Sequence, residues 1–429
     1  MSDKTLQRLP LALAALLTCL SAHADFTSDD GRARLSGFGT LGVARTNSDD
    51  ALFNYPGQGG GVDKQAGMEV DSKVGLQGTY KFTDSISGTA QLLTKYRAQG
   101  QYQPEFEWAF AKWQATPGLS IRAGRIGAPF FMISDFRDVG YANTAVRPPL
   151  DVYGQVPVSS SDGGDISYQM NLGGTTLTGT LWGGQARADY ASALRSTSAQ
   201  GTTDVDPVTV RIKKQIGVNL QAEFDGGYTL RFGHSQGRLS VDSGSINSTI
   251  ALAGQLGGAA ARNIASNALL TDDTKASFTG IGASVDRDNF VVATEFTKRR
   301  IKQGTVADTT GWYVLGGYRI GSVLPYVVVS KLKVDSVNVP TVSAATVGTT
   351  LARGIAALQS TQSVAQKTTS IGVRWDAMRN TAVKVQFDRV SKPANSNGLF
   401  LVENPVTDTA FQQAKKNINV ISLAVDFVF

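Results

Sequence analysis

The last thirteen residues of the chain, Asn417 to Phe429, have the pattern of an extended strand with two different faces. In an extended strand, one face carries Ile421, Leu423, Val425, Phe427 and Phe429, and the other carries Ser422, Ala424 and Asp426. A tilted strand of about 9 to 11 residues crosses a bilayer. Lipid offers no partner to its free N–H and C=O groups, so the strand needs a neighbour along each edge. A closed barrel supplies both neighbours, and this segment is therefore expected to pair with an early strand and complete a ring.

The N-terminus has the pattern of a secretory signal peptide. Lys4 and Arg8 precede an apolar run over residues 9–20, and Ala22-His23-Ala24 forms a small-x-small cleavage site. The sequence therefore predicts a signal peptide over residues 1–24 and a single mature domain over residues 25–429.

Composition narrows the class of protein further. The single cysteine, Cys19, lies within the signal, so neither a disulfide nor a thiolate nucleophile is expected after cleavage. A lipoprotein signal centred on Cys19 is disfavoured, because Thr18 is a poor residue to precede a lipidated cysteine. Loss of residues 1–24 leaves 39 basic and 34 acidic residues, a net charge of +5, which is no nucleic-acid signature. No apolar run of about 18 residues follows the signal, so a membrane protein with this sequence has to cross by strands.

Alternating segments recur along the whole mature chain and predict an all-β, transmembrane antiparallel barrel of about sixteen strands. The clearest segments besides the last are 32–45, 72–82, 165–172, 211–224 and 367–376. Weaker ones are 85–96, 105–114, 119–125, 175–185, 228–236, 276–285, 290–299, 311–320, 323–332 and 381–390.

The connections between these segments alternate between short and long. Short ones carry turn residues, such as Asp225-Gly226-Gly227 and Gly173-Gly174. Long ones lie near 46–71, 126–164, 186–210, 237–275, 333–366 and 391–416, and 250–270 could form a loop helix. Short periplasmic turns opposite long external loops are typical of outer-membrane barrels. The alternative is a soluble β-sandwich or β-helix, but sandwich strands are shorter and their turns have no reason to segregate by length.

Several short motifs, taken in order, resemble the Gram-negative, particularly proteobacterial, trimeric outer-membrane porins. They are 370–376 with its following turn 378–380, 316–320 with Pro325-Tyr326, and the terminal 425–429. The resemblance covers essentially the whole mature chain. It implies a homotrimer with one pore per protomer, and a C-terminal Phe429 that the outer-membrane barrel-assembly machinery recognises for insertion. It also implies that the connection 126–164 folds into the lumen as a constriction loop, although this chain lacks the Pro-Glu-Phe-Gly-Gly stretch of the enteric members.

A ring of this size is wide enough to hold an aqueous channel, so function is expected where the channel narrows. Asp135, Asp138 and Asp151 could form an acidic side of the constriction. Facing them would be the basic residues of the first strands: Arg34, Lys73, Lys95, Arg97 and Arg122, with Arg125 at the foot of the loop. Opposed charges across a narrow passage create a transverse field, and this set predicts a mild anion preference. The alternative for each residue is an ordinary solvated charge of the lumen or a loop.

These observations favour a porin that lets small hydrophilic solutes diffuse passively across the outer membrane of a Gram-negative bacterium. The mature chain has one histidine, His234, and its neighbour Ser235 points to the opposite face of the strand, so no enzyme, metal or cofactor is predicted. Two alternatives remain open. One is a channel selective for small carboxylates or other anions, and the other is an adhesin or receptor barrel that acts through external loops such as 237–275. The expected partners are outer-membrane lipid, further copies of the chain, the assembly machinery and solutes, with no nucleic acid.

Overall fold

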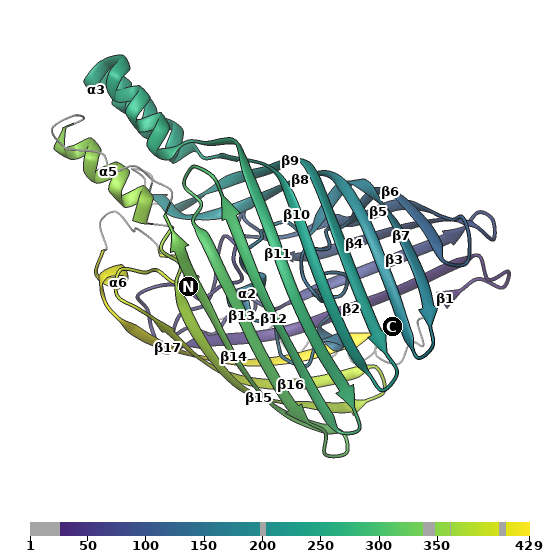
Figure 1. The fold of residues 1–429 in the computed structure, drawn as a ribbon. Coiled ribbons are helices and arrows are strands. Elements are labelled where there is room, and N and C mark those ends of the chain that lie inside the picture. Colours follow the sequence, from purple (N-terminus) through teal and green to yellow (C-terminus); the bar gives the residue numbers. More distant parts are fainter. Residues whose placement is uncertain (1–25, 198–202, 338–347, 361, 403–408) are drawn as a thin grey trace.

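The computed structural model describes residues 26–197, 203–337, 348–360, 362–402 and 409–429. The predicted signal peptide, residues 1–24, lies outside the described residues. The chain forms one antiparallel sheet that closes on itself (Figure 1). Because all described strands belong to this one sheet, the sandwich alternative is wrong, and the predicted barrel is confirmed.

Sixteen strands, β2 to β17, make the ring, and each pairs with its neighbours in sequence. A short strand, β1 (Phe26–Thr27), lies outside the ring and pairs with the start of β2. The ring strands are β2 Ala33–Thr46, β3 Lys73–Lys81, β4 Ile86–Tyr96, β5 Tyr102–Gln114, β6 Leu119–Gly127, β7 Ser160–Leu172, β8 Thr175–Thr197, β9 Thr203–Phe224, β10 Tyr228–Asp242, β11 Thr271–Arg287, β12 Phe290–Ile301, β13 Asp308–Tyr318, β14 Val323–Ser336, β15 Gln366–Met378, β16 Thr381–Lys392 and β17 Lys416–Val428.

The ring closes where the last strand meets the first, as the sequence predicts. Strand β17 pairs with β2 in a register that sets Phe427 opposite Gly39. The chain end continues this ladder, since the Phe429 N–H donates to the Gly37 carbonyl at 2.9 Å and the Gly37 N–H donates back at 2.7 Å. A Cβ at Gly39 would lie 2.4 Å from the Phe427 ring, so a larger residue at this position would displace the aromatic side chain that covers it.

The two faces of the wall differ as the alternation predicts. On β17, Ile421 and Leu423 are about half exposed, whereas Ser422 and Asp426 on the inner face are buried. Aromatic pairs gather near the short turns, with Tyr80 against Phe82 and Phe290 against Tyr318 at ring-centroid distances of 5.1 and 4.9 Å. An outer surface of apolar residues bounded by aromatic rings is the outer face of a transmembrane barrel.

The prediction of a long loop over 186–210 is wrong, because β8 and β9 extend across most of it. Where these strands pair with each other and with β10, the register shifts by one residue, and Lys214 has a φ of 51°. The extra residue forms a β-bulge, which turns the following side chains to the opposite face. On the C-terminal side of the bulge, apolar residues such as Ile216 therefore lie on the outer face. On its N-terminal side, residues of the same parity, such as Val210, are buried.

Helices lie in the long loops. Helix α3 (Gly244–Leu269) covers the predicted helical segment 250–270 except its last residue, and it packs against α5 (Thr349–Ser360) at one end of the barrel (Figure 1). A short helix, α6 (Ala410–Gln413), precedes the last strand. None of the helices in the described ranges is long and apolar enough to cross a membrane.

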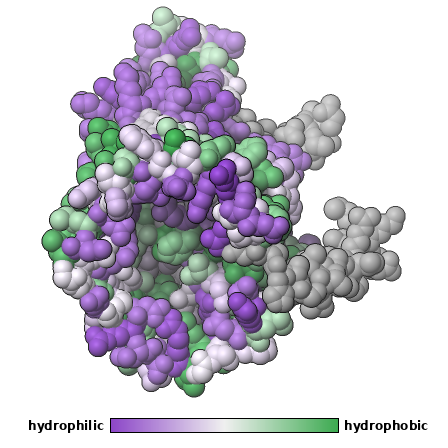
Figure 2. Space-filling view, turned by 90° about the vertical axis from the view of Figure 1, so that its right-hand side faces the viewer, coloured by the Kyte–Doolittle hydropathy of each residue, from purple (hydrophilic) through white to green (hydrophobic). Residues whose placement is uncertain are grey.

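The connection between β6 and β7, residues 128–159, folds into the barrel and is called the inner loop below. It contains a 3₁₀ turn, η1 (Gly140–Ala142), and helix α2 (Leu150–Tyr153). Its apolar residues Phe130, Phe131 and Tyr153 pack on Phe278 and Tyr313 of the inner wall. Figure 2 views the molecule from the right-hand side of Figure 1 and shows a central hollow ringed mainly by hydrophilic residues. The inner loop thus narrows the lumen.

Candidate functional site

The inner loop is held first by the strands β10 and β12. Arg231 donates from Nη2 to the Pro129 carbonyl at 2.6 Å. The Glu295 carboxylate accepts the Met132 N–H at 3.0 Å and the Tyr153 hydroxyl at 2.8 Å. Two segments of the loop that are twenty-one residues apart are thereby bound to one buried carboxylate. This contact fixes the side of the loop that carries its apolar residues.

A second attachment is the lysine Lys384 of β16, whose side chain is fully buried. Its ammonium group donates to the carbonyls of Gly140, Asn143 and Ala145 at 2.8, 2.5 and 3.2 Å. It also forms an ion pair with Asp426 of β17 at 2.8 Å. A lysine that binds three carbonyls of one turn holds that turn firmly against the wall.

A third attachment is the loop arginine Arg147. Its guanidinium lies 2.6 Å from Asp71 and 2.9 Å from Asp388, and it donates to the Ser422 hydroxyl at 2.6 Å. Burial alone would lower the pKa of Arg147, but the carboxylates of Asp71 and Asp388 outweigh burial and raise it well above its usual value. Arg147 therefore stays charged and joins the inner loop to the connection after β2 and to two strands of the wall.

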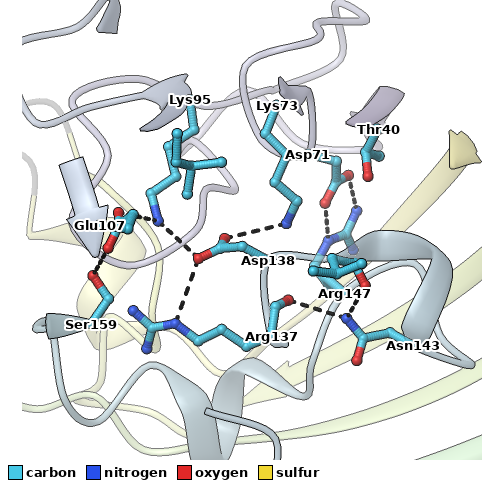
Figure 3. A network of polar contacts seen from close by, with 12 residues as sticks. Thr40, Asp71, Lys73, Lys95, Glu107, Arg137, Asp138, Asn143, Arg147 and Ser159 are labelled. Atoms are coloured by element: carbon cyan, nitrogen blue, oxygen red, sulfur yellow. Dashed lines mark hydrogen bonds and ion pairs between the residues drawn. The ribbon is translucent and has the colours of Figure 1, made fainter. Parts of the chain in front are cut away.

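The charged tip of the inner loop faces the opposite wall (Figure 3). Lys73 of β3 and Lys95 of β4 stand directly opposite each other in the register, an arrangement of like charges that is unfavourable by itself. Asp138 from the loop lies between them, with Lys73 Nζ 3.5 Å from one carboxylate oxygen and Lys95 Nζ 3.2 Å from the other. Arg137 adds a third contact at 3.7 Å. Asp138 thus bridges the loop tip to two strands of the wall.

Strand β5 extends this network. Glu107 has no partner in the β4–β5 register, because the register shifts between Gln91 and Leu92 and leaves Glu107 as the bulged residue. It is 5% exposed, and its carboxylate lies 3.2 Å from Arg97 and 3.5 Å from Lys95. Ser159 at the end of the inner loop donates to Glu107 at 2.6 Å.

We call these six charged residues the Asp138 cluster: Lys73, Lys95, Arg97, Glu107, Arg137 and Asp138. Burial alone would raise the pKa of Asp138, but the charges of Lys95, Lys73 and Arg137 outweigh burial and hold the pKa well below its usual range. The carboxylate is therefore ionised throughout the physiological range. The cluster borders a cavity of about 130 Å³ that also reaches Tyr55 and Arg187.

Of the residues predicted to form the constriction, the structure brings together Lys73, Lys95, Arg97 and Asp138. Arg122 lies on the wall, paired with Asp165 at 2.6 Å. Arg125, at the foot of the loop, pairs with Asp162 at 2.7 Å. Arg34 is exposed near the start of β2, six residues and about 20 Å from the level of Thr40.

The two remaining predicted acids behave differently. Asp135 is exposed on the inner loop, with its carboxylate near Gly127 at the end of β6. Asp151 is 1% exposed, and one of its oxygens accepts the Ser330 hydroxyl at 2.8 Å. Asp151 therefore does not face an aqueous passage, and its predicted place in the constriction is wrong. Helix α2 turns this side chain into the wall, where burial raises its pKa to about 6.

Sequence reasoning missed the residues that anchor the loop: Asp71, Glu107, Arg137, Arg147, Lys384, Asp388, Asp426 and also Arg374, which donates to the Tyr141 and Asn143 carbonyls at 2.8 and 3.1 Å. Part of the signal was present, because Lys384 and Asp388 share the polar face of an alternating strand, and Asp426 stands on the polar face of the last strand. The histidine considered for catalysis, His234, contacts Thr279 through Nδ1 at 2.8 Å, and Ser235 is buried on the other face of β10.

No protein-family model matches this sequence, and no curated protein sequence matches it either. The fold, however, is shared with solved outer-membrane channels. The compared structures are OmpF of Salmonella typhi, with 14% identity and a TM-score of 0.51, the channel DcaP of Acinetobacter baumannii, with 11% and 0.53, and the anion-selective porin of Comamonas acidovorans, with 13% and 0.52. The matches cover 94%, 95% and 92% of this chain and 99%, 100% and 99% of those chains. The chain therefore has the fold of a porin over nearly its full length.

Proposed function

We propose that this protein is an outer-membrane channel for the passive diffusion of small hydrophilic solutes. The observation that carries the proposal is a closed sixteen-strand wall, apolar outside and polar inside, around a loop that is anchored within the lumen. Rings of this size enclose an aqueous passage unless a segment narrows it. The structural neighbours named as an outer-membrane channel and as an anion-selective porin support the same function. The polar residues gathered at the inner loop then act by sieving and by their field, and perform no catalysis.

Uptake into liposomes tests the sieve. The purified barrel in liposomes should admit a small sugar rapidly and larger sugars progressively more slowly, as measured by osmotic swelling. Liposomes with heat-unfolded protein serve as the control. Failure to admit even the smallest sugar, in liposomes shown to contain folded barrel, would contradict a diffusion channel.

The proposed selectivity is a mild preference for anions. The Asp138 cluster and its neighbour Glu105 contain four basic and three acidic side chains, a net charge of +1. One structural neighbour is described as an anion-selective porin, which agrees in sign. Reversal potentials in a potassium chloride gradient measure the preference, and a strongly cation-selective channel would contradict it.

The proposed assembly is a homotrimer in the outer membrane of a Gram-negative bacterium, inserted through recognition of Phe429. The terminal ring is available for recognition before closure, because it packs on Gly37 only when β17 joins β2. Chemical cross-linking in native membranes should give a three-chain species. Deletion of Phe429 should reduce the folded protein in the membrane, while its refolding in detergent continues.

A further inference from the structure

An apolar cavity of about 230 Å³ lies between the inner loop and the wall formed by β9 to β12. Its lining includes Val210, Leu239, Phe278 and Ile301 from these four strands and Val156 from the loop. Most of these side chains are less than a tenth exposed. The cavity therefore offers an apolar surface on the lumen side of the wall.

The bulge at Lys214 is a physical cause of this lining. On the C-terminal side of the bulge, β9 directs Ile216, Val218 and Leu220 outward, where each is more than a third exposed. On the N-terminal side of the bulge, the even-numbered residues Val208 and Val210 are less than a tenth exposed and border the cavity. One inserted residue thus moves an apolar row from the membrane side of the wall to the lumen side.

The lining also carries polar side chains, such as Gln215, Ser235 and Gln236, and two polar groups among them are suited to bind an anion. The first is Arg299, the one charged residue among the described residues of the lining. The Arg299 guanidinium donates to the carbonyls of Gln155 and Ala307. Its neighbour Arg300 forms an ion pair with Asp308 at 3.8 Å. Within the described ranges no carboxylate lies within 4.0 Å of Arg299, and the charge of Asp308 acts on it only from a longer distance.

The second polar group is the amide of Gln362, which is 4% exposed. Neither its nitrogen nor its oxygen has a hydrogen-bond partner among the described residues. A buried amide without partners costs about 1 to 3 kcal/mol, and a ligand that accepts its N–H would recover part of this. The Arg299 guanidinium and the Gln362 amide could bind an anionic group, and the apolar lining could bind an apolar body. A solute that has both parts would fit this cavity.

We propose that this cavity binds a small apolar carboxylic acid with a single ring or a branched chain. For comparison, a cavity of about 150 Å³ in another protein accommodates benzene, so about 230 Å³ holds one ring and its carboxylate. The apolar body lies against Val210 and Leu239, and the carboxylate binds Arg299 and the Gln362 amide. The inference rests on the proposed channel, to which it adds a solute class that the lumen retains.

Benzoate is the probe for this site, tested as a blocker of single-channel current in planar bilayers. It should block the wild-type channel in a saturable way. Acetate, which has the charge without the ring, and benzyl alcohol, which has the ring without the charge, should each be weaker by roughly tenfold or more. Equal block by benzoate and acetate would overturn the proposal, because the apolar lining would then contribute nothing.

A matched pair of variants on β10 tests the location. Leu239→Trp fills the cavity and should abolish benzoate block while potassium chloride conductance remains. Leu230→Trp makes the same change nine residues away, at a side chain 51% exposed on the outer face, and should leave the block intact. Equal block in both variants would overturn the proposed site.

Further measurements keep the outcome decisive. If Leu239→Trp does not fold, Arg299→Gln replaces it and should weaken benzoate by roughly tenfold without changing benzyl alcohol. A wild-type protein that conducts but is not blocked by benzoate overturns this inference and leaves the channel standing. If no conductance is seen, the proposed function fails. Calorimetry of benzoate binding to the detergent-folded barrel then decides the site, and absence of binding heat overturns it.

Discussion

The most deeply buried ion pair among the described residues joins two strands of the wall and holds the inner loop. Lys384 and Asp426 both have fully buried side chains and lie 2.8 Å apart. Removing one partner of a buried pair leaves the other charge uncompensated, at a cost of about 3 to 5 kcal/mol. Asp426→Asn should therefore lower the free energy of unfolding by roughly this amount in denaturant titrations of the detergent-solubilised barrel.

The control for that variant is an exposed pair. Lys64 and Asp49 lie 2.6 Å apart, but both side chains are more than half exposed. Exposed pairs contribute about 0 to 1 kcal/mol, so Asp49→Asn should change stability little. Equal effects of the two substitutions would show that the Lys384–Asp426 pair does not hold the fold together.

Asp151 makes a prediction about pH. Burial raises its pKa from 3.8 to about 6, so the folded protein holds this proton more tightly than the unfolded chain. The contribution of protonated Asp151 to the free energy of unfolding is fully present below pH 3.8 and is lost as the pH rises toward 6. Two pKa units correspond to about 3 kcal/mol. Asp151→Asn should thus stabilise the protein by up to about 3 kcal/mol at pH 7.5, with the gain vanishing near pH 4.

Thermal unfolding of both proteins across this pH range measures the effect. The midpoint of the variant should exceed that of the wild type above pH 6 and approach it near pH 4. A difference that does not change with pH would mean that Asp151 is not titrating in its buried position.

At the scale of an element, the inner loop is fixed to the wall at several points, and ion pairs of Asp138 hold its tip. Asp138→Asn removes the acid that lies between Lys73 and Lys95 and leaves both lysines facing the lumen. The ratio of chloride to potassium permeability should then rise on the order of fivefold, because local potentials of a few kT act in opposite directions on the two ions. Reversal potentials measure this ratio. Asp49→Asn, in an external loop, is the matched control, and an unchanged ratio in Asp138→Asn would remove the cluster from the ion path.

The strands themselves were largely predictable, because the alternation of each strand in a barrel wall is a local pattern. The exception shows the limit of that pattern. Strands β8 and β9 continue through residues 186–210, which were predicted as a loop. The bulge at Lys214, near the N-terminal end of the predicted strand 211–224, reverses the parity of the apolar residues beyond it. A single alternating pattern therefore does not continue past the bulge, although the hydrogen-bonded ladder does.

The site was predictable only in part. Lys73, Lys95 and Arg97 could be placed on an inner face from the parity of their strands. The partners of Arg147 could not, because Asp71 is 76 residues and Asp388 is 241 residues away in sequence. Their meeting depends on the path of the inner loop across the lumen, which is set by packing and not by any local pattern. The same reason explains why Asp151, an acid in the predicted loop, lies buried against the wall.

At the scale of the whole molecule, the backbone ladder runs around the ring from β2 to β17 and back to β2. The apolar side chains of the outer face then contact lipid, and the backbone polar groups stay paired within the wall. The inner loop crosses this ring and is bound at several points of the wall. The molecule is therefore expected to conduct ions continuously at rest, without a step that opens it.

Single-channel recording in planar bilayers tests this central claim most directly. The account predicts discrete upward current steps on insertion, with a conductance that rises in proportion to the concentration of potassium chloride. Protein that is shown to be folded and inserted in the bilayer, yet gives no current steps at any salt concentration, would contradict it.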